Sequence, residues 1–588
     1  MKRLLALMIL PLLYVVAPAS LEAATATYAV EVRGVEDNDI TKTIKATSQL
    51  FVLKKRPPNN IVSLKLRASS DVALITKVLN SYGYYEPAVT TRVVVTHGET
   101  NYSVIVEIVE GPLYTLESFD VDTGAKKGLE YSPESLDLEI GGAALAEDIV
   151  AAKNAALTMI QRSGYPFAVI DDEDIVANTT KKTISVTLTI KSGKLARYGV
   201  TTISGLDTVE EDFVRDSIAW KEGDLFSPDD IATSRRNLEE LGLFNFVTTT
   251  YKEENLSGGV LPMSVIVAEK PHRRISFGVG YSTYYEATAA FQWKHRNLHG
   301  RGEALAFSAD VNNKQQKGSL SYRIPHFLKN NQDLLSVLTA SQESTDGYDA
   351  RTITMKSSIE RRINERTTVS FGGGIDYVNT TKSDDDSPYL LANLPYSIKW
   401  HNYKDFMDPS SGAFVGVRTT PYVNTLDTRE SFLKNKITGT VYQPLTDKII
   451  VAVTASVGSI MGSPRRNIPM PYRFYGGSAH ALRGYKYHTV SPYGEKNTPI
   501  GGKSILVGSV EARYRATKQF AVAAFYDVGN VYEYFIPQLD KKILRSWGLG
   551  LRYHTPIGPF RFDLAFPLDK RADIDHAYQF YVTLGHSF

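Results

Sequence analysis

An arginine in a glycine-rich stretch has the clearest chemical role in this sequence. The stretch contains the pair Gly476-Gly477 and ends in Arg483-Gly484-Tyr485. A guanidinium can hold a carboxylate through two parallel hydrogen bonds, so Arg483 requires anionic partners in a defined position. Gly484 permits a close backbone approach or a positive φ angle, and Tyr485 can pack against a wall beside it. The pattern predicts a segment that binds to an acidic surface.

The connection that carries this stretch is long. About forty residues separate the strand-like run that ends at Ile460 from the run that starts at Lys503. Ordinary hairpin connections have 2–5 residues, and much longer ones are usually functional. In the run that follows, Glu511 and Arg513 share one face because successive side chains of a strand alternate. We expect that charged face to line a polar interior.

The composition excludes several classes of function. The sequence contains no cysteine, which rules out disulfide bonds and thiolate catalysis. It also contains no H-E-x-x-H motif, and no pattern that pairs a nucleophile with a base. The formal net charge is +2, so no basic field favours nucleic acid. We therefore expect neither an enzyme nor a cofactor, a metal site or a nucleic-acid partner.

The second half of the chain supplies the elements that position these residues. From Arg273 onward, runs of alternating apolar and polar residues recur between Gly, Asn, Asp and Pro residues. They span 275–281, 287–295, 303–311, 317–324, 334–341, 352–359, 367–377, 391–400, 413–423, 432–442, 449–460, 503–515, 520–532, 543–554, 559–566 and 578–588. An even number of such runs is typical of bacterial outer-membrane barrels, which close because no unpaired backbone edge can face lipid. We predict a transmembrane antiparallel β-barrel of about sixteen strands over residues 272–588.

The first and last strands of this barrel are expected to meet at a weak seam. The last run alternates in polarity and ends on an aromatic residue, as closing strands of outer-membrane barrels do. Glycines remove side chains that would pack and should weaken the seam, although they could merely relieve crowding. The predicted seam residues are Ile275, Phe277, Gly278, Val279 and Gly280 on the first strand and Tyr581, Gly585 and Phe588 on the last. A parted seam would expose backbone N–H and C=O groups to an incoming strand.

The N-terminus has the features of a secretory signal. Met1-Lys2-Arg3 is positively charged, the stretch Leu4–Ala17 is apolar, and A-x-A cleavage patterns follow at 17–19 and 24–26. We expect a signal peptide within residues 1–26. An uncleaved membrane anchor is the alternative, but about fourteen apolar residues are too few to cross a bilayer comfortably.

Three segments of the first half share one design. In each, a helical stretch ends at a glycine close to aromatic residues, namely Gly83, Gly164 and Gly242. Two strand-like runs and a short turn follow, and equivalent glycines are about eighty residues apart, the size of a small domain. The predicted β-α-α-β-β domains span 27–111, 112–193 and 194–271.

These repeats resemble POTRA domains, the periplasmic modules of outer-membrane assembly and transport proteins. The barrel half contains further motifs of one family in the expected order. They are Arg296–Glu303, the loop motif that ends in Arg483-Gly484-Tyr485, Phe525–Val531, Gly548–Pro559 and Arg561-Phe562-Asp563. The chain resembles the outer-membrane assembly factors that include BamA, TamA and the two-partner secretion transporters. This resemblance implies that Arg483 faces Asp527 and Glu511 inside the barrel. It also implies a bacterial outer-membrane protein with N-terminal domains in the periplasm.

Three POTRA copies before a barrel most resemble the TamA branch of this family, the outer-membrane subunit of the translocation and assembly module. That resemblance implies insertion or secretion of outer-membrane proteins such as autotransporters, by strand pairing at the seam. The implied partners are a TamB-like periplasmic protein anchored in the inner membrane, unfolded outer-membrane protein clients and outer-membrane lipids. A two-partner secretion transporter for one exoprotein and an intermembrane phospholipid transport component remain alternatives. A passive porin would not explain the periplasmic domains.

Overall fold

The computed structural model describes residues 27–97, 101–123, 133–381, 388–403, 405, 408–426, 430–479, 481–494, 497–517, 519–555 and 558–584. The predicted signal peptide and the predicted seam residues Gly585 and Phe588 lie outside these residues. The chain forms two compact units, and the second consists of residues 202–219, 233–250 and 264–588. Within the described residues, no helix is both long enough and apolar enough to span a membrane.

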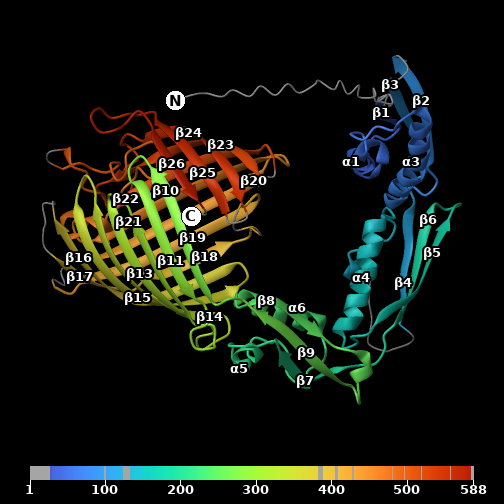
Figure 1. Ribbon diagram of the computed structural model, residues 1–588, viewed down its shortest axis with the longest axis horizontal. Helices are drawn as coiled ribbons and strands as arrows, with labels where there is room; N and C mark the ends of the chain where they lie inside the picture. The colour runs from blue at the N-terminus through green and yellow to red at the C-terminus, as the bar shows by residue number, and fades with distance from the viewer. Residues whose placement is uncertain are drawn as a thin grey trace, which may run out of the picture. The chain divides into compact units, whose positions relative to one another are not determined.

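The first domain is a three-stranded sheet with helices packed on it (Figure 1). Its elements are β1 (Thr27–Arg33), α1 (Asn38–Thr47), α2 (Gln49–Val52), α3 (Ile61–Ser81), β2 (Ala88–His97) and β3 (Asn101–Val109). The central strand β3 pairs parallel to β1 and antiparallel to β2. Every second residue of β3 is buried, so Tyr102, Val104, Val106 and Ile108 face the helices.

The next two domains repeat this sheet order. The second has β4 (Thr115–Asp122), η1 (Pro133–Leu136), α4 (Ala146–Arg162), β5 (Val169–Asn178) and β6 (Thr183–Lys191), with the order β4-β6-β5. The third has β7 (Arg197–Ser204), α5 (Glu211–Arg215), α6 (Pro228–Glu240), β8 (Phe244–Thr250), η2 (Glu253–Asn255) and β9 (Val260–Glu269), with the order β7-β9-β8. The glycines at 83, 164 and 242 all have positive φ where a helix ends. The predicted three-domain fold is confirmed.

The second half forms a closed antiparallel barrel in which β10 and β26, green and red in Figure 1, lie side by side. The strands are β10 (Arg273–Ser282), β11 (Glu286–His295), β12 (Ala304–Val311), β13 (Gln315–Ile324), β14 (Gln332–Ser344), β15 (Asp349–Asn364), β16 (Thr367–Thr381), β17 (Tyr389–Asn393), β18 (Tyr396–His401), β19 (Gly412–Asn424), β20 (Ser431–Pro444), β21 (Ile449–Gly462), β22 (Ser504–Arg515), β23 (Phe520–Tyr532), β24 (Leu544–Thr555), β25 (Gly558–Pro567) and β26 (Gln579–Leu584).

The described part of the barrel has sixteen strands, in agreement with the prediction of about sixteen, because β17 and β18 are two parts of one strand. Both parts pair with β16 on one side and with β19 on the other. Pro395 lies between them and has no N–H group to donate to the ladder. The interruption therefore leaves the strand order unchanged.

Side chains alternate between the outside of the barrel and its interior, here called the lumen. On β22, Val510, Ala512 and Tyr514 are exposed on the outside, whereas Glu511 and Arg513 are buried on the inner face, as predicted. The end of the barrel where β10 begins is the near end, and the opposite end is the far end. The long connection 463–503 starts at the far end and is called the lumen loop.

Candidate functional site

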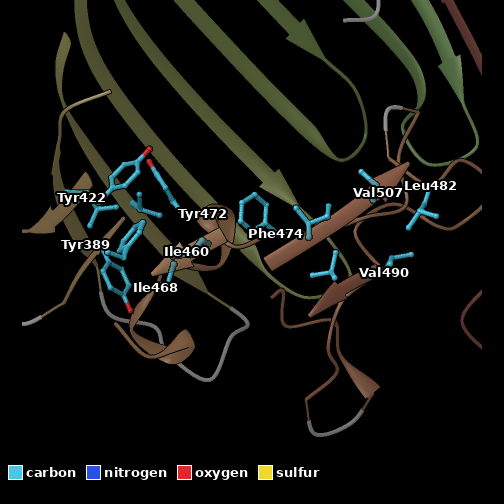
Figure 2. Packing of buried hydrophobic residues seen from close by; sticks show 14 of the residues in the cluster. Tyr389, Tyr422, Ile460, Ile468, Tyr472, Phe474, Leu482, Val490 and Val507 are labelled. Atoms are coloured by element: carbon cyan, nitrogen blue, oxygen red, sulfur yellow. The ribbon is translucent and has the colours of Figure 1, made fainter. Parts of the chain in front are cut away.

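The lumen loop packs its apolar side chains against the inner wall of the barrel (Figure 2). Tyr472 lies beside Tyr422 and Phe432 of β19 and β20, with ring centroids 5.2 and 6.4 Å apart. The Tyr472 hydroxyl donates to Asp376 of β16 over 2.8 Å, and Lys434 of β20 donates to the Tyr472 carbonyl oxygen over 2.7 Å. One loop tyrosine thus joins three wall strands.

Arg483 binds two neighbouring strands of the wall. Its Nε and Nη2 atoms donate to the two carboxylate oxygens of Asp527 over 2.9 and 2.8 Å, and its backbone N–H donates to the same group over 3.0 Å. Its Nη1 donates to Glu511 over 2.9 Å, and its Nη2 also donates to Ser509 over 3.0 Å. The guanidinium carbon lies 3.4 Å from the ring centroid of Phe525. A buried guanidinium held by a bidentate pair is the geometry that Arg is suited for.

The pairing register of β22 with β23 explains how these groups meet. Ser509 is opposite Asp527, and Glu511 is opposite Phe525. Alternation sends all four side chains to the lumen. Arg483, Asp527 and Glu511 are 8%, 3% and 8% exposed, so each charge depends on its partners for stability.

The two residues after Arg483 anchor the loop to the last strands. Gly484 has a φ of 96°, and a β-carbon there would lie 3.1 Å from the Phe566 carbonyl carbon and 3.2 Å from the Ser546 side chain. Only glycine allows both that φ and that approach. Tyr485 is fully buried, and its hydroxyl donates to the Arg545 carbonyl oxygen of β24 over 2.7 Å.

The glycine pair at the start of the motif has a separate place. Gly476 exchanges backbone hydrogen bonds of 2.9 and 3.2 Å with Val490, on the returning half of the lumen loop. Gly477 has a φ of 86° and donates its N–H to the Ala481 carbonyl over 2.9 Å. These two glycines shape the loop itself and do not contact the carboxylates that Arg483 binds.

Two further arginines fix the loop and were not singled out in the sequence. Arg473 donates to the carbonyl oxygens of Ile468 and Ile500 over 2.8 Å each, which closes the base of the loop. Arg571, in the connection from β25 to β26, donates to the Thr489 carbonyl over 2.8 Å and forms an ion pair with Asp575. Both lie in irregular segments, where the period-two pattern that identified the strands gives no signal.

An aromatic cluster joins the loop to the first hairpin of the barrel. Tyr284 and Tyr285 form the turn between β10 and β11, and their rings lie 4.6 and 5.1 Å from the ring of Tyr487. Tyr487 also stacks on His488 at 3.8 Å and donates to Glu343 of β14 over 3.2 Å. The loop therefore contacts the first hairpin through Tyr487 and β24 through Tyr485.

The seam between β10 and β26 is short in the described part of the chain. Its pairs are Tyr281 with Val582 and Ser282 with Tyr581, and Thr283 adds a backbone hydrogen bond of 3.1 Å to Phe580. By contrast, β10 and β11 pair over ten positions and β25 and β26 over six.

The predicted seam residues of β10 fall on two faces. Ile275, Phe277 and Val279 point outward and are 60%, 79% and 81% exposed. Gly278 and Gly280 lie on the inner face; Gly278 pairs with Ala290, and a β-carbon at Gly280 would lie 3.7 Å from the Val582 carbonyl oxygen. Tyr581 lies on β26 next to Gly484 of the lumen loop.

The third domain is joined to the near end of the barrel through Glu269, the last residue of β9. Its Oε1 atom accepts the backbone N–H groups of Asp207, Thr208 and Val209 over 2.8, 3.0 and 2.9 Å. Asn297, in the turn after β11, donates to the Thr208 carbonyl over 3.2 Å. The family motif at 296–303 is thus part of a joint between the two folds.

Hydrogen bonding keeps this carboxylate ionised. Burial would raise the pKa of Glu269, but the backbone N–H groups of Asp207 and Val209, with further donors, outweigh burial and lower the pKa to about 2. Compared with the ordinary value of 4.5, the shift corresponds to about 3 kcal/mol in favour of the ionised form. Because the folded pKa is lowered, this stabilisation is present above pH 4.5 and is lost as the pH falls through about 2.

We expect Glu269→Gln to loosen the joint at neutral pH. The neutral amide lacks the charge that orients the three backbone N–H groups, so the segment after β9 should open more often. Trypsin should then cut after Arg273 or Arg274 about tenfold faster in the detergent-solubilised protein. Glu254→Gln, at an exposed position of the third domain, is the matched control. Equal cleavage rates for the Glu269→Gln and Glu254→Gln variants would contradict the role of Glu269 in holding the joint together.

Comparison with known proteins identifies the family. Residues 297–588 match the Omp85 superfamily domain. Residues 196–270 match POTRA, described as a surface antigen variable number repeat. A protein of Nitratidesulfovibrio vulgaris named outer membrane protein assembly factor BamA is 23% identical over 544 residues, covering 88% of this chain and 67% of that protein. One of the same name from Neisseria meningitidis serogroup B is 20% identical over 590 residues, covering 88% and 73%.

Among solved structures, BamA from Haemophilus ducreyi lacking POTRA domains 1–3 superposes with a TM-score of 0.64. It shares 17% identity, covering 80% of this chain and 99% of that one, so it supports the fold alone. The superfamily match, the POTRA match and the closed barrel agree with one another. The chain therefore belongs to the Omp85 superfamily: it is an outer-membrane β-barrel with periplasmic POTRA domains, an outer-membrane protein assembly factor and not an enzyme.

Proposed function

We propose that this protein inserts β-barrel clients by pairing a client strand with β10 at the seam. The observation that carries the proposal is the short pairing of β10 with β26. The near end of the barrel directly follows the periplasmic POTRA domains, so the far end is the extracellular end. Of the described residues, only those at this far end of β10 pair across the seam. An extended client strand can add to such an edge through main-chain hydrogen bonds, which require no particular client sequence.

The lumen loop is placed to control that seam. Tyr485 holds β24 on one side, whereas Tyr487, two residues later, stacks on the β10–β11 turn on the other side. The ion pairs of Arg483 fix the loop between these contacts. While the loop is docked, the extracellular ends of β10 and of the last strands are held together, and release of Tyr487 would free the first hairpin.

We expect Tyr487→Ala to increase the opening of the seam. Each aromatic contact is worth about 0.5–1.5 kcal/mol, so loss of the contacts to Tyr284 and Tyr285 should raise the open population at least about fivefold. Amide hydrogen exchange of residues 281–285 should accelerate by the same factor. Tyr534→Ala is the matched control, because this tyrosine is exposed in the connection between β23 and β24. Unchanged amide exchange of residues 281–285 in the Tyr487→Ala variant would contradict the proposal that the lumen loop controls the seam.

The insertion function can be tested with purified components. Vesicles that contain this protein should insert an unfolded outer-membrane barrel client faster than empty vesicles do. Insertion is measured by protease protection and heat-modifiable gel mobility of the client. No acceleration for any barrel client would refute the proposal. Single-channel conductance tests the porin alternative, since a porin gives a large steady pore and a loop-filled lumen gives small or erratic currents.

We further propose that the protein works in the manner of the TamA branch, with autotransporter clients and a TamB-like partner. Support comes from the three POTRA-like sheets of the described chain, which precede the barrel. Affinity purification from membranes should recover a very large periplasmic protein with a single inner-membrane anchor. If deletion of this protein blocked the export of one dedicated exoprotein alone, the result would instead indicate a two-partner transporter. A defect confined to phospholipid transfer between the membranes would indicate the lipid transport alternative.

A further inference from the structure

The helices of the first domain concentrate positive charge. Residues 38–81, which form α1, α2 and α3, contain eight Lys and Arg residues and two acidic residues. Asp39 pairs with Lys42 over 2.9 Å, and Asp71 is fully buried, where it accepts hydrogen bonds from Ser48 and from two backbone N–H groups. The formal net charge of this segment is therefore +6, whereas that of the whole chain is +2. The helices of the other two domains lack this excess, since α4 has no net charge and α6 has a net charge of −2.

Four of these cations lie where α2 leads into α3. Lys54, Lys55 and Arg56 are exposed in the connection, and Lys65 is exposed in the second turn of α3. Among the residues that the structure describes, none of the four forms an ion pair. Arg67 of α3 donates to the Arg56 carbonyl oxygen over 3.2 Å, which holds the connection against the helix. The four charges therefore share one corner of the domain and are available to an anionic partner.

Three apolar side chains are exposed at the same corner. Val52, the last residue of α2, is 60% exposed, and Val62 and Leu66 of α3 are 67% and 70% exposed. Val62 and Leu66 are four residues apart, so they lie on one face of the helix. The core does not include them, because Leu64 and Ala68 face inward and are at most 1% exposed. Apolar side chains beside exposed cations are typical of a surface that lies against a membrane.

We propose that these four cations and three apolar side chains, here called the basic corner, bind the surface of a phospholipid bilayer with anionic headgroups. The domain is periplasmic and therefore works between membranes. The apolar side chains can enter the boundary between headgroups and acyl chains. The lysine stems can bend along that boundary, so that their ammonium groups stay among the phosphates.

The kind of cation favours lipid over an acidic protein. Three of the four cations of the basic corner are lysines. A fixed carboxylate of a protein partner is held best by the planar fork of arginine, whereas lysine is a flexible point charge. Flexible point charges suit headgroups that move within a bilayer.

Vesicle flotation tests the basic corner in the full-length protein. The protein is embedded in nanodiscs of phosphatidylcholine and mixed with vesicles of phosphatidylcholine, with or without phosphatidylglycerol. It should bind the vesicles that contain phosphatidylglycerol at least about tenfold more tightly than the neutral ones, and added salt should weaken that binding. The triple variant Lys54→Gln, Lys55→Gln, Lys65→Gln should reduce this preference at least about fivefold.

A matched control removes the same charge outside the first domain. The variant Lys194→Gln, Lys221→Gln, Lys252→Gln changes three exposed lysines and should bind both kinds of vesicle as the unmodified protein does. The variant Val62→Ser, Leu66→Ser should bind anionic vesicles at least about threefold more weakly. Its salt dependence should stay the same, because its charges are unchanged.

Equal binding to neutral and anionic vesicles, or equal binding by the two lysine variants, would overturn the proposal. Polyglutamate is the probe for an acidic protein. Tighter binding of polyglutamate than of the anionic vesicles would also overturn the proposal and would assign the basic corner to a protein partner. The assay measures no client insertion, so its outcome is independent of the proposed function.

Discussion

Replacing Arg483 with alanine is expected to reduce client insertion at least about tenfold while a folded barrel remains in the outer membrane. The substitution removes every side-chain hydrogen bond between the loop motif and the wall carboxylates. Breaking a buried ion pair typically costs about 3–5 kcal/mol, which is enough to undock the lumen loop. The barrel should survive, because the ladder between β22 and β23 pairs over twelve positions without this side chain.

The wall carboxylates keep other partners in the Arg483→Ala variant, so the damage is confined to the docking of the loop. Glu511 keeps Arg513 and Arg552 as partners, and Asp527 keeps the Ser509 hydroxyl at 2.7 Å. Arg483→Lys is the matched variant, because it preserves the charge but cannot form the bidentate pair. Its insertion rate should lie between that of the unmodified protein and that of Arg483→Ala. Outer-membrane abundance, heat-modifiable mobility and the vesicle insertion assay report barrel and function separately. Normal insertion by Arg483→Ala at normal abundance would refute the role of this arginine.

The barrel could be predicted from the sequence because its signal is local. A residue on a strand must alternate between lipid and lumen, so the sixteen segments follow from polarity with a period of two. The same rule put Glu511 and Arg513 on the inner face. The break at Pro395 was not predicted, because both halves of that strand run in one direction between the same two neighbours and the polarity pattern continues through it. Several strands are also longer than predicted, as β15 shows.

The contacts of the loop depend on distant parts of the chain, so no local pattern reveals them. Alternation places Asp527 on a face, but the pairing register decides that it lies beside Ser509. Family resemblance supplied the partners of Arg483, whereas Tyr487 and its neighbours at 284 and 285 carry no motif. Glu269 likewise carries no local signal, because the five groups that hydrogen-bond to its carboxylate lie in a loop about sixty residues earlier and at His272.

A disulfide across the seam is expected to abolish client insertion reversibly. Tyr281 and Val582 are registered partners on β10 and β26, and the chain has no native cysteine to interfere. Residues directly opposite in an antiparallel pair have β-carbons about 4.5–5.5 Å apart, so a small adjustment permits the bond. In the Tyr281→Cys, Val582→Cys protein, oxidation should lower insertion at least about tenfold, and reduction should restore it.

The control pair keeps the cysteine at position 582 and takes its partner from β25, on the other side of β26. Val582 is also opposite Phe562 of β25, so Phe562→Cys with Val582→Cys locks an ordinary ladder and leaves the seam free. Oxidation of this control should leave insertion unchanged, which separates closure of the seam from general stiffening of the barrel. If the Tyr281–Val582 disulfide forms fully and insertion stays normal, clients do not pass through a parting of β10 from β26. The exposed outer face of β10 would then need another explanation, and the lumen loop could no longer act by holding the seam closed.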